Sequence, residues 1–258
     1  MINFENAEKE FLKYVNKFDL KDEATNRKKW HSFRVMENSE ILAQKLKLNQ
    51  EEAEVAKLIG LLHDIGRFEQ YEKAKKFLNE EKFDHGNYGE FLLKQNNYIE
   101  KYISDKKYIP IILKAVKNHN KYKIEEGLTE KEEMFCKLIR DADKLDILYE
   151  TVCVYWKSEK EVKNIENSKI SPNIEKQLKK QEEIKRQGNE KFDSADHLLI
   201  ILSFIYDINF KETFEIIENE QYINKTLKRF DFKDKETKEK MKEIEKEIEQ
   251  YINSNIIS

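Results

Sequence analysis

Apolar residues recur along most of the chain at intervals of three and four, which is the spacing of one face of an α-helix. Segments 33–46 and 55–62 show this spacing, whereas the alternation of apolar and polar positions that marks a strand is nearly absent. A continuous apolar run at 198–206 falls well short of the roughly 20 residues of a membrane span and is typical of a buried helix. The pattern predicts an all-α protein.

Capping residues and proline mark several helix boundaries. In three places a capping side chain precedes Glu by three residues, which predicts a helix start: Asn49 with Glu52, Thr129 with Glu132, and Asn209 with Glu212. Gly66 follows LLHDI and predicts a helix end. Pro110 suits the first turn of a helix over 109–119, where its missing N–H costs nothing.

The chain is expected to have three parts. Residues 1–156 form a helical core, 157–192 a charged excursion, and 193–258 further helices that pack on the core. The excursion is rich in Lys, Glu and Asn and is expected to carry one exposed helix around Pro172, although an ordinary surface helix explains the charge run equally well. Near the C-terminus, four apolar residues form a narrow stripe along one face of a predicted helix: Met241, Ile244, Ile248 and Tyr251. This stripe is expected either to pack on the core of the same chain or to form a homodimer interface.

Composition narrows the class of protein. Charged residues reach 38% against a usual figure of about 25%, yet 48 Lys and Arg nearly cancel 51 Asp and Glu, which leaves a net charge of −3. This balance gives no strong signal for nucleic-acid binding. The N-terminal segment has no secretory signal, and two cysteines are too few for a disulfide framework. We therefore expect a cytoplasmic protein.

The histidines are scarce and unevenly placed. Four of the five lie in or at the ends of predicted helices, and one of these, His63, is followed directly by Asp64. Asp143 interrupts a helix that is otherwise apolar on one face. Buried polar groups need partners, and imidazole with carboxylate suits a divalent metal. The pattern thus favours helix ends that converge on a metal, although histidines at helix ends also serve structural roles.

The order of these residues resembles the HD superfamily of metal-dependent phosphohydrolases. The resemblance covers about 28–150 and is carried by LLHDIGRF, DHGNYGEFLL, KNHN and IRDADKLDIL. It implies a single-domain helical bundle of HD-domain type with additional C-terminal helices. It also implies that Asp64 bridges two divalent ions (Mn, Fe, Ni, Mg or Zn), one bound by His31, His63 and Asp143 and the other by His85 and His119.

Further residues receive expected roles, some from the resemblance and others from what a phosphate ester requires. Asp143 is assigned as the ligand because a basic and an apolar residue follow it, whereas Asp141 and Asp146 are expected to orient ligands. A phosphate ester needs cationic contacts, and Arg67 and Lys144 are the main candidates, with Arg34 ranked behind them. Each of these cations could equally belong to the surface. Asn120 is a weaker candidate for a substrate contact, and His197 is expected to cap a helix or pack in the core.

The resemblance implies hydrolysis of a phosphomonoester or phosphodiester by a metal-activated water, and we expect Asp64, Arg67 and Lys144 to be catalytic residues. The substrate would be a nucleotide or another small phosphorylated metabolite. Two alternatives stay open. One is a di-iron oxygenase of the same superfamily that acts on a small polyol or phosphonate. The other is a non-catalytic regulatory HD module, which the presence of all six ligands disfavours.

Overall fold

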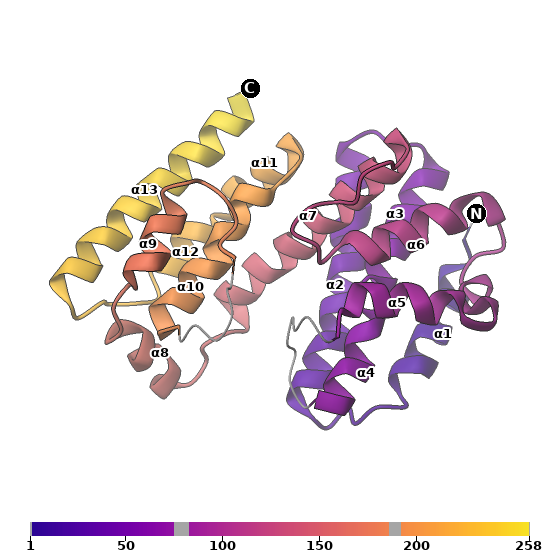
Figure 1. Cartoon of the computed structure of the whole chain (residues 1–258), viewed down its shortest axis with the longest axis horizontal. Coiled ribbons are helices and arrows are strands. Elements are labelled where there is room, and N and C mark those ends of the chain that lie inside the picture. Colours follow the sequence, from indigo (N-terminus) through magenta and orange to yellow (C-terminus); the bar gives the residue numbers. More distant parts are fainter. Residues whose placement is uncertain (1, 75–82, 186–191, 258) are drawn as a thin grey trace. The chain divides into compact units, whose positions relative to one another are not determined.

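The computed structural model describes residues 2–74, 83–185 and 192–257, and all of its regular elements are helices (Figure 1). The all-α prediction is confirmed. The chain divides into two compact units, Met1–Asp143 and Lys144–Ser258, and the division falls inside one continuous helix, α7 (Glu130–Cys153). The boundaries expected at residues 156 and 192 stay predictions of domain organisation.

The N-terminal unit is built around a long helix, α2, that packs extensively against α3. Helices α4, α5 and α6 pack in sequence beside them, α4 on α5 and α5 on α6 (Figure 1). The elements before α7 are α1 (Phe4–Val15), α2 (Glu23–Lys45), α3 (Gln50–Leu62), α4 (Ile65–Ala74), α5 (His85–Lys94), the 3-10 helices η1 (Gln95–Lys101) and η2 (Lys106–Tyr108), and α6 (Ile109–Asn118).

Two of the three predicted helix caps are confirmed, and so is the predicted position of Pro110 in the first turn of a helix. Asn49 and Glu52 form a reciprocal capping box at α3, because each side chain bonds the other residue's backbone N–H. Thr129 and Glu132 make the same exchange at the start of α7. Pro110 lies in the first turn of α6. Local capping chemistry therefore sets several starts of the helices that carry the histidines.

Two boundary predictions are wrong. Gly66 does not end a helix, because α3 stops at Leu62 and α4 begins at Ile65 after a two-residue turn. Instead, a Cβ on Gly66 would lie 2.4 Å from the carbonyl oxygen of His85, so the glycine allows α4 and α5 to approach closely. Asn209 does not cap α11 (Lys211–Glu220): the N-cap is Phe210, and the Asn209 side chain donates to the carbonyl of Asp207 at 3.1 Å.

The C-terminal unit is a separate helical assembly. The predicted excursion contains two short helices that contact α10, and Ile165, Ile174 and Leu178 are buried in them, which differs from the single exposed helix expected. Residues 186–191 of that excursion lie outside the described residues. The elements are α8 (Glu159–Glu166), α9 (Pro172–Leu178), α10 (Ser194–Leu202), the 3-10 helix η3 (Ser203–Asp207), α11, α12 (Tyr222–Leu227) and α13 (Lys235–Ile257).

The two apolar stretches of this unit are accounted for by packing. The run at 198–206 spans α10 and η3, and Leu198, Leu199 and Leu202 are completely buried, as expected. The C-terminal stripe lies on α13, which packs against α11 and α12 of the same unit. The homodimer alternative stays a prediction. Of the helices in residues 2–74, 83–185 and 192–257, none has both the length and the apolar character needed to cross a membrane.

Gly60 sets the spacing between α2 and α3, which leads to a stability prediction. A Cβ at this position would lie 2.7 Å from both the Met36 Cα and the Val35 carbonyl oxygen, and backbone atoms cannot yield cheaply. We expect Gly60→Ala to lower the free energy of unfolding by about 1–3 kcal/mol, because the methyl group overpacks the interface. Chemical denaturation followed by circular dichroism measures this change.

The matched control is Gly89→Ala in α5. There the nearest atom to an added Cβ is a side-chain methyl of Val116 at 3.1 Å, which can move by a few tenths of an ångström. Since alanine also favours helix over glycine by roughly 1 kcal/mol, we expect this variant to be close to neutral. Equal stability of the two variants would show that Gly60 does not set the helix spacing.

Candidate metal centre

The six predicted ligands come together in the N-terminal unit, mostly at helix ends. His63 is the C-cap of α3, and Asp64 follows it in the turn before α4. His85 is the first residue of α5, and His119 is the C-cap of α6. His31 and Asp143 project from within α2 and α7. Helix ends leave backbone groups without intrahelical partners, so they are suitable places for polar side chains in a core.

His31, His63 and Asp143 form a cluster with one oxygen of Asp64. The Nε2 atoms of His31 and His63 lie 3.2 Å apart, and Nε2 of His31 lies 3.1 Å from Oδ1 of Asp143. Oδ2 of Asp64 lies 3.6 Å from the His31 nitrogen and 3.7 Å from the His63 nitrogen. Both imidazoles are buried, with 1% and 0% of their side chains exposed. Four potential ligand atoms therefore face one small volume.

His85 and His119 form a matching pair on the other oxygen of Asp64. Their Nε2 atoms lie 3.0 Å apart, and each is 3.4 Å from Oδ1 of Asp64. The two oxygens of one carboxylate thus address two separate histidine pairs. The ligand atoms of His31, His63 and Asp64, and likewise those of Asp64, His85 and His119, all lie within 4.8 Å of one another. This geometry is suited to a bridging carboxylate.

Backbone carbonyls orient two of the imidazoles. Nδ1 of His63 donates to the carbonyl of Gly60 at 2.8 Å, and Nδ1 of His119 donates to the carbonyl of Val116 at 2.7 Å. In both cases the acceptor lies three residues earlier, at a helix end where carbonyls lack intrahelical donors. The N–H on Nδ1 leaves the lone pair on Nε2 free, which is the form in which histidine binds a metal.

The surroundings keep the carboxylates ionised and the imidazoles of His85 and His119 neutral. Burial opposes ionisation of Asp64, but Lys28, His63 and neighbouring donors outweigh it and hold its pKa well below its usual value. Burial likewise opposes ionisation of Asp143, but the nearby imidazoles of His31 and His63 outweigh it and hold its pKa well below its usual value. Burial is the main cause that lowers the pKa of His85 and of His119. These are the protonation states that metal ligands require.

Arg140 and Glu125 hold the segment that ends in His119. The guanidinium of Arg140 is buried and donates to the carbonyls of Asn118 at 3.3 Å, of His119 at 3.5 Å and of Lys121. Glu125 accepts hydrogen bonds from Lys114 and Lys117, which lower its pKa to about 2. These contacts link α6, α7 and the connecting loop, and so they fix the position of His119.

Lys28 was not identified from the sequence. Its Nζ lies 2.8 Å from Oδ2 of Asp64, and its side chain is 15% exposed. Lys28 stands three residues before His31, on the same face of α2, and this spacing was the available signal. Arg67 was predicted and lies beside the other oxygen, with Nε 3.4 Å from Oδ1 of Asp64 and one terminal nitrogen bonded to Gln70 at 2.9 Å.

The other predicted residues have varied surroundings. Lys144 lies in the C-terminal unit, is buried, and pairs with Asp207 at 2.6 Å. Arg34 is half-buried in α2, and Asp141 and Asp146 are buried in α7. Asn120 contacts Asp84 and His85. His197 is exposed in α10 with its ring against Phe192, and Asp193 caps that helix, so the expected capping or core role is wrong. Catalytic roles for Arg67 and Lys144 stay predictions.

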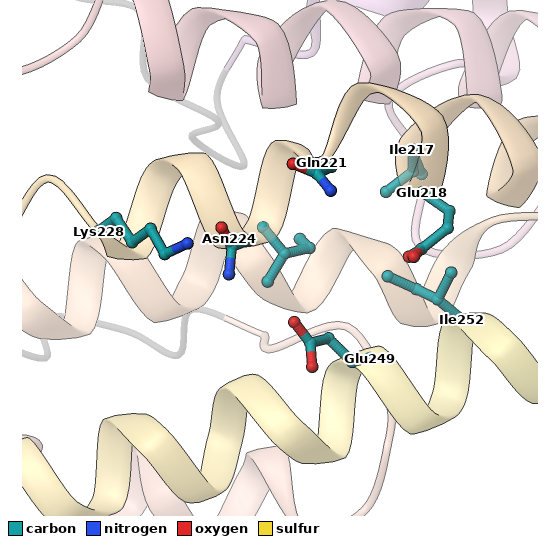
Figure 2. Close-up of a pocket in the computed structure, with 8 residues that line it drawn as sticks. Ile217, Glu218, Gln221, Asn224, Lys228, Glu249 and Ile252 are labelled. Atoms are coloured by element: carbon teal, nitrogen blue, oxygen red, sulfur yellow. The ribbon is translucent and has the colours of Figure 1, made fainter.

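A small cavity in the C-terminal unit offers different chemistry. It has a volume of about 190 Å³ and lies among α11, α12 and α13 (Figure 2). Burial, together with the charges of Glu245 and Glu218, raises the pKa of Glu249 in its wall. The cavity is lined by carboxylates, amides, a lysine and isoleucines: Ile217, Glu218, Gln221, Ile223, Asn224, Lys228, Glu249 and Ile252. These residues include no imidazole, which is the ligand that suits transition metals such as Zn, Fe and Ni.

Comparison with known families agrees with the location of the histidine and aspartate cluster in the N-terminal unit. Residues 30–148 match the family model of the HD domain, a range that contains all six clustered ligands. HD domains bind divalent metals and belong to a superfamily of metal-dependent hydrolases. Neither the curated proteins nor the solved structures that were searched gave a match.

The shared carboxylate leads to a prediction about metal content. We expect Asp64→Ala to lose both equivalents of divalent metal, because the residue faces both histidine pairs, and His85→Ala to lose one. Metal analysis of the purified full-length protein after dialysis measures the stoichiometry, with circular dichroism to confirm folding. His197→Ala, a histidine outside the cluster, is the matched control and should keep all of its metal. Two equivalents retained in His85→Ala would exclude that residue as a ligand.

Proposed function

Because residues 30–148 are an HD domain, we propose that the protein is a metal-dependent phosphohydrolase with a binuclear centre. The observation that carries the proposal is a pair of cations on opposite oxygens of Asp64, Lys28 on Oδ2 and Arg67 on Oδ1, beside an imidazole and carboxylate donor set. A negatively charged substrate would meet both cations as it approached the ligands.

The donor set fits divalent ions of intermediate hardness. Imidazole nitrogen suits Mn, Fe, Ni and Zn, and the carboxylates of Asp64 and Asp143 add the charge that stabilises a dication. In the proposed arrangement, His31, His63, Asp64 and Asp143 hold one ion, and His85 and His119 hold the second together with Asp64. Two such ions supply Lewis acidity that activates water and stabilises charge in an in-line displacement at phosphorus.

The two cations have separate parts in this proposal. Nε of Arg67 is buried and makes no hydrogen bond within the described residues, although it lies 3.4 Å from Asp64. An unsatisfied buried donor is costly, and an outer oxygen of a phosphate would satisfy it. Lys28 contributes a compact ammonium on the opposite side of the carboxylate. Together they would orient the phosphate and offset its charge.

The proposed substrate is a nucleotide or another small phosphorylated metabolite. Both cysteines are free thiols, which fits the reducing interior of a cell, and we extend the proposal to a cytoplasmic enzyme. Lys144 is a further proposed cation for the reaction. Its ammonium would have to leave Asp207, from which it lies 2.6 Å away, to reach a substrate.

The experiment that tests the proposal is a substrate panel on metal-depleted protein reloaded with one ion at a time: Mn, Fe, Ni, Mg or Zn. Nucleotides, sugar phosphates and a chromogenic phosphodiester are assayed for release of phosphate or alcohol. We expect metal-dependent release that Asp64→Ala abolishes. No release with any ion, together with oxygen uptake on polyols or phosphonates by the iron form, would favour the oxygenase. A protein inactive in both assays would be a regulatory module.

The two cations give a more specific prediction. We expect Lys28→Ala and Arg67→Ala each to lower kcat/KM for hydrolysis by about 10- to 100-fold, because each removes a charged contact to the substrate phosphate. Steady-state kinetics are measured beside metal analysis, and both variants should keep the metal content of the wild type.

Lys29→Ala is the matched control, since the Lys29 ammonium lies 4.4 Å from the centroid of the Trp30 ring and has no assigned contact with Asp64. It should leave kcat/KM within about twofold of the wild type, as expected for a cation outside the site. An unchanged kcat/KM in both Lys28→Ala and Arg67→Ala would contradict the assigned contacts. A loss of activity that follows a loss of metal would assign these residues to the metal centre instead.

A further inference from the structure

Asn120 is half-buried beside His85 in an arrangement that favours one orientation of its amide. Its amino group lies 3.1 Å from Oδ1 of Asp84 and 3.2 Å from Nδ1 of His85. Its carbonyl oxygen is buried and has no hydrogen-bond partner within the described residues. Lys121 pairs with Oδ2 of Asp84, and Oδ1 of Asp84 caps α5 by accepting from the N–H of Asn87 at 3.0 Å. The carboxylate that holds the amide is therefore itself held in place.

This arrangement distinguishes His85 from the other oriented histidines. Nδ1 of His63 and Nδ1 of His119 donate to backbone carbonyls, whereas Nδ1 of His85 faces an amino group and must accept. A neutral imidazole carries one N–H. In His85 that N–H is consequently on Nε2, from which it donates to Nε2 of His119 at 3.0 Å. A metal requires the lone pair of this same atom.

We infer that Asn120, oriented by Asp84, is a positioning residue that makes the His85–His119 position the weaker of two metal positions. The inference rests on the proposed binuclear centre. For His85 to bind through Nε2, its proton must move to Nδ1, where it would face the amino group of Asn120 as donor against donor. Rotating the amide resolves that conflict but brings its oxygen against Oδ1 of Asp84. Either cost falls on the His85–His119 position, which also has one ligand fewer than the position of His31, His63, Asp64 and Asp143, so we expect the ions to bind in sequence.

The first test reads the ring tautomers directly by ¹⁵N NMR of the histidine side chains in the full-length protein after chelation and dialysis. We expect His85 to carry its proton on Nε2, and His63 and His119 to carry theirs on Nδ1. Single His→Gln variants assign the signals. A His85 ring protonated on Nδ1 would overturn the inference. This measurement does not depend on enzymatic activity.

The second test is a calorimetric titration of the same protein with Mn²⁺ alone. We expect two classes of position, and Asn120→Ala should strengthen the weaker one about tenfold, because it removes the amino group that opposes an Nδ1–H on His85 and leaves room for a water to accept that proton. Asn120→Leu, which removes the amino group but fills its place with apolar atoms, should strengthen it less. The stronger position should not change in either variant.

The outcomes separate this inference from the proposed function. If Asn120→Ala binds the second ion no more tightly than the wild type, Asn120 has only a packing role and the inference is wrong. If the protein binds no divalent ion at all, the proposed function is contradicted, and the NMR tautomer still decides whether Asn120 orients His85. Hydrolysis without a difference between the two metal positions would retain the function and overturn the inference.

Discussion

The N-terminal unit depends on the burial of one carboxylate. Asp64 is 2% exposed, and an ionised group removed from water to that extent is stable only when it is surrounded by opposite charge and hydrogen-bond donors. Lys28, Arg67 and two pairs of histidines supply that environment. Each of these groups comes from a different part of the sequence, so the buried charge requires α2, α3, α4, α5 and α6 to meet at one point.

Close helix packing makes this meeting point possible. Glycines stand where a helix approaches its neighbour's backbone: Gly60 against α2, Gly66 against the start of α5, and Gly86 against the end of α6. A side chain at any of these positions would separate two helices that both contribute groups around Asp64. Three of the six glycines of the chain therefore lie where helix separation matters.

Much of this unit could be predicted from sequence because its determinants are local. Helical periodicity, the caps at Asn49 and Thr129, and the placement of histidines at helix ends all act within a few residues. Lys28 and Arg140 were missed because their partners lie 36 residues away at Asp64 and about 20 residues away at the end of α6, and helix spacing carries no such information. The same limit explains the wrong prediction at Gly66. The role of this glycine depends on the backbone of α5, which lies further along the chain, whereas the local sequence pattern predicts a helix end.

The source of each histidine's hydrogen bond also bears on how such a centre can change over generations. His63 and His119 are oriented by main-chain oxygens, which every residue type provides, so a point substitution at the acceptor residue leaves the oxygen in place. His85 takes its hydrogen bond from a side chain, which a single codon change can remove or reverse in polarity. Mutational drift therefore acts unequally on the two halves of the cluster. The orientation of His63 and His119 is robust to such substitutions, whereas that of His85 depends on one side chain.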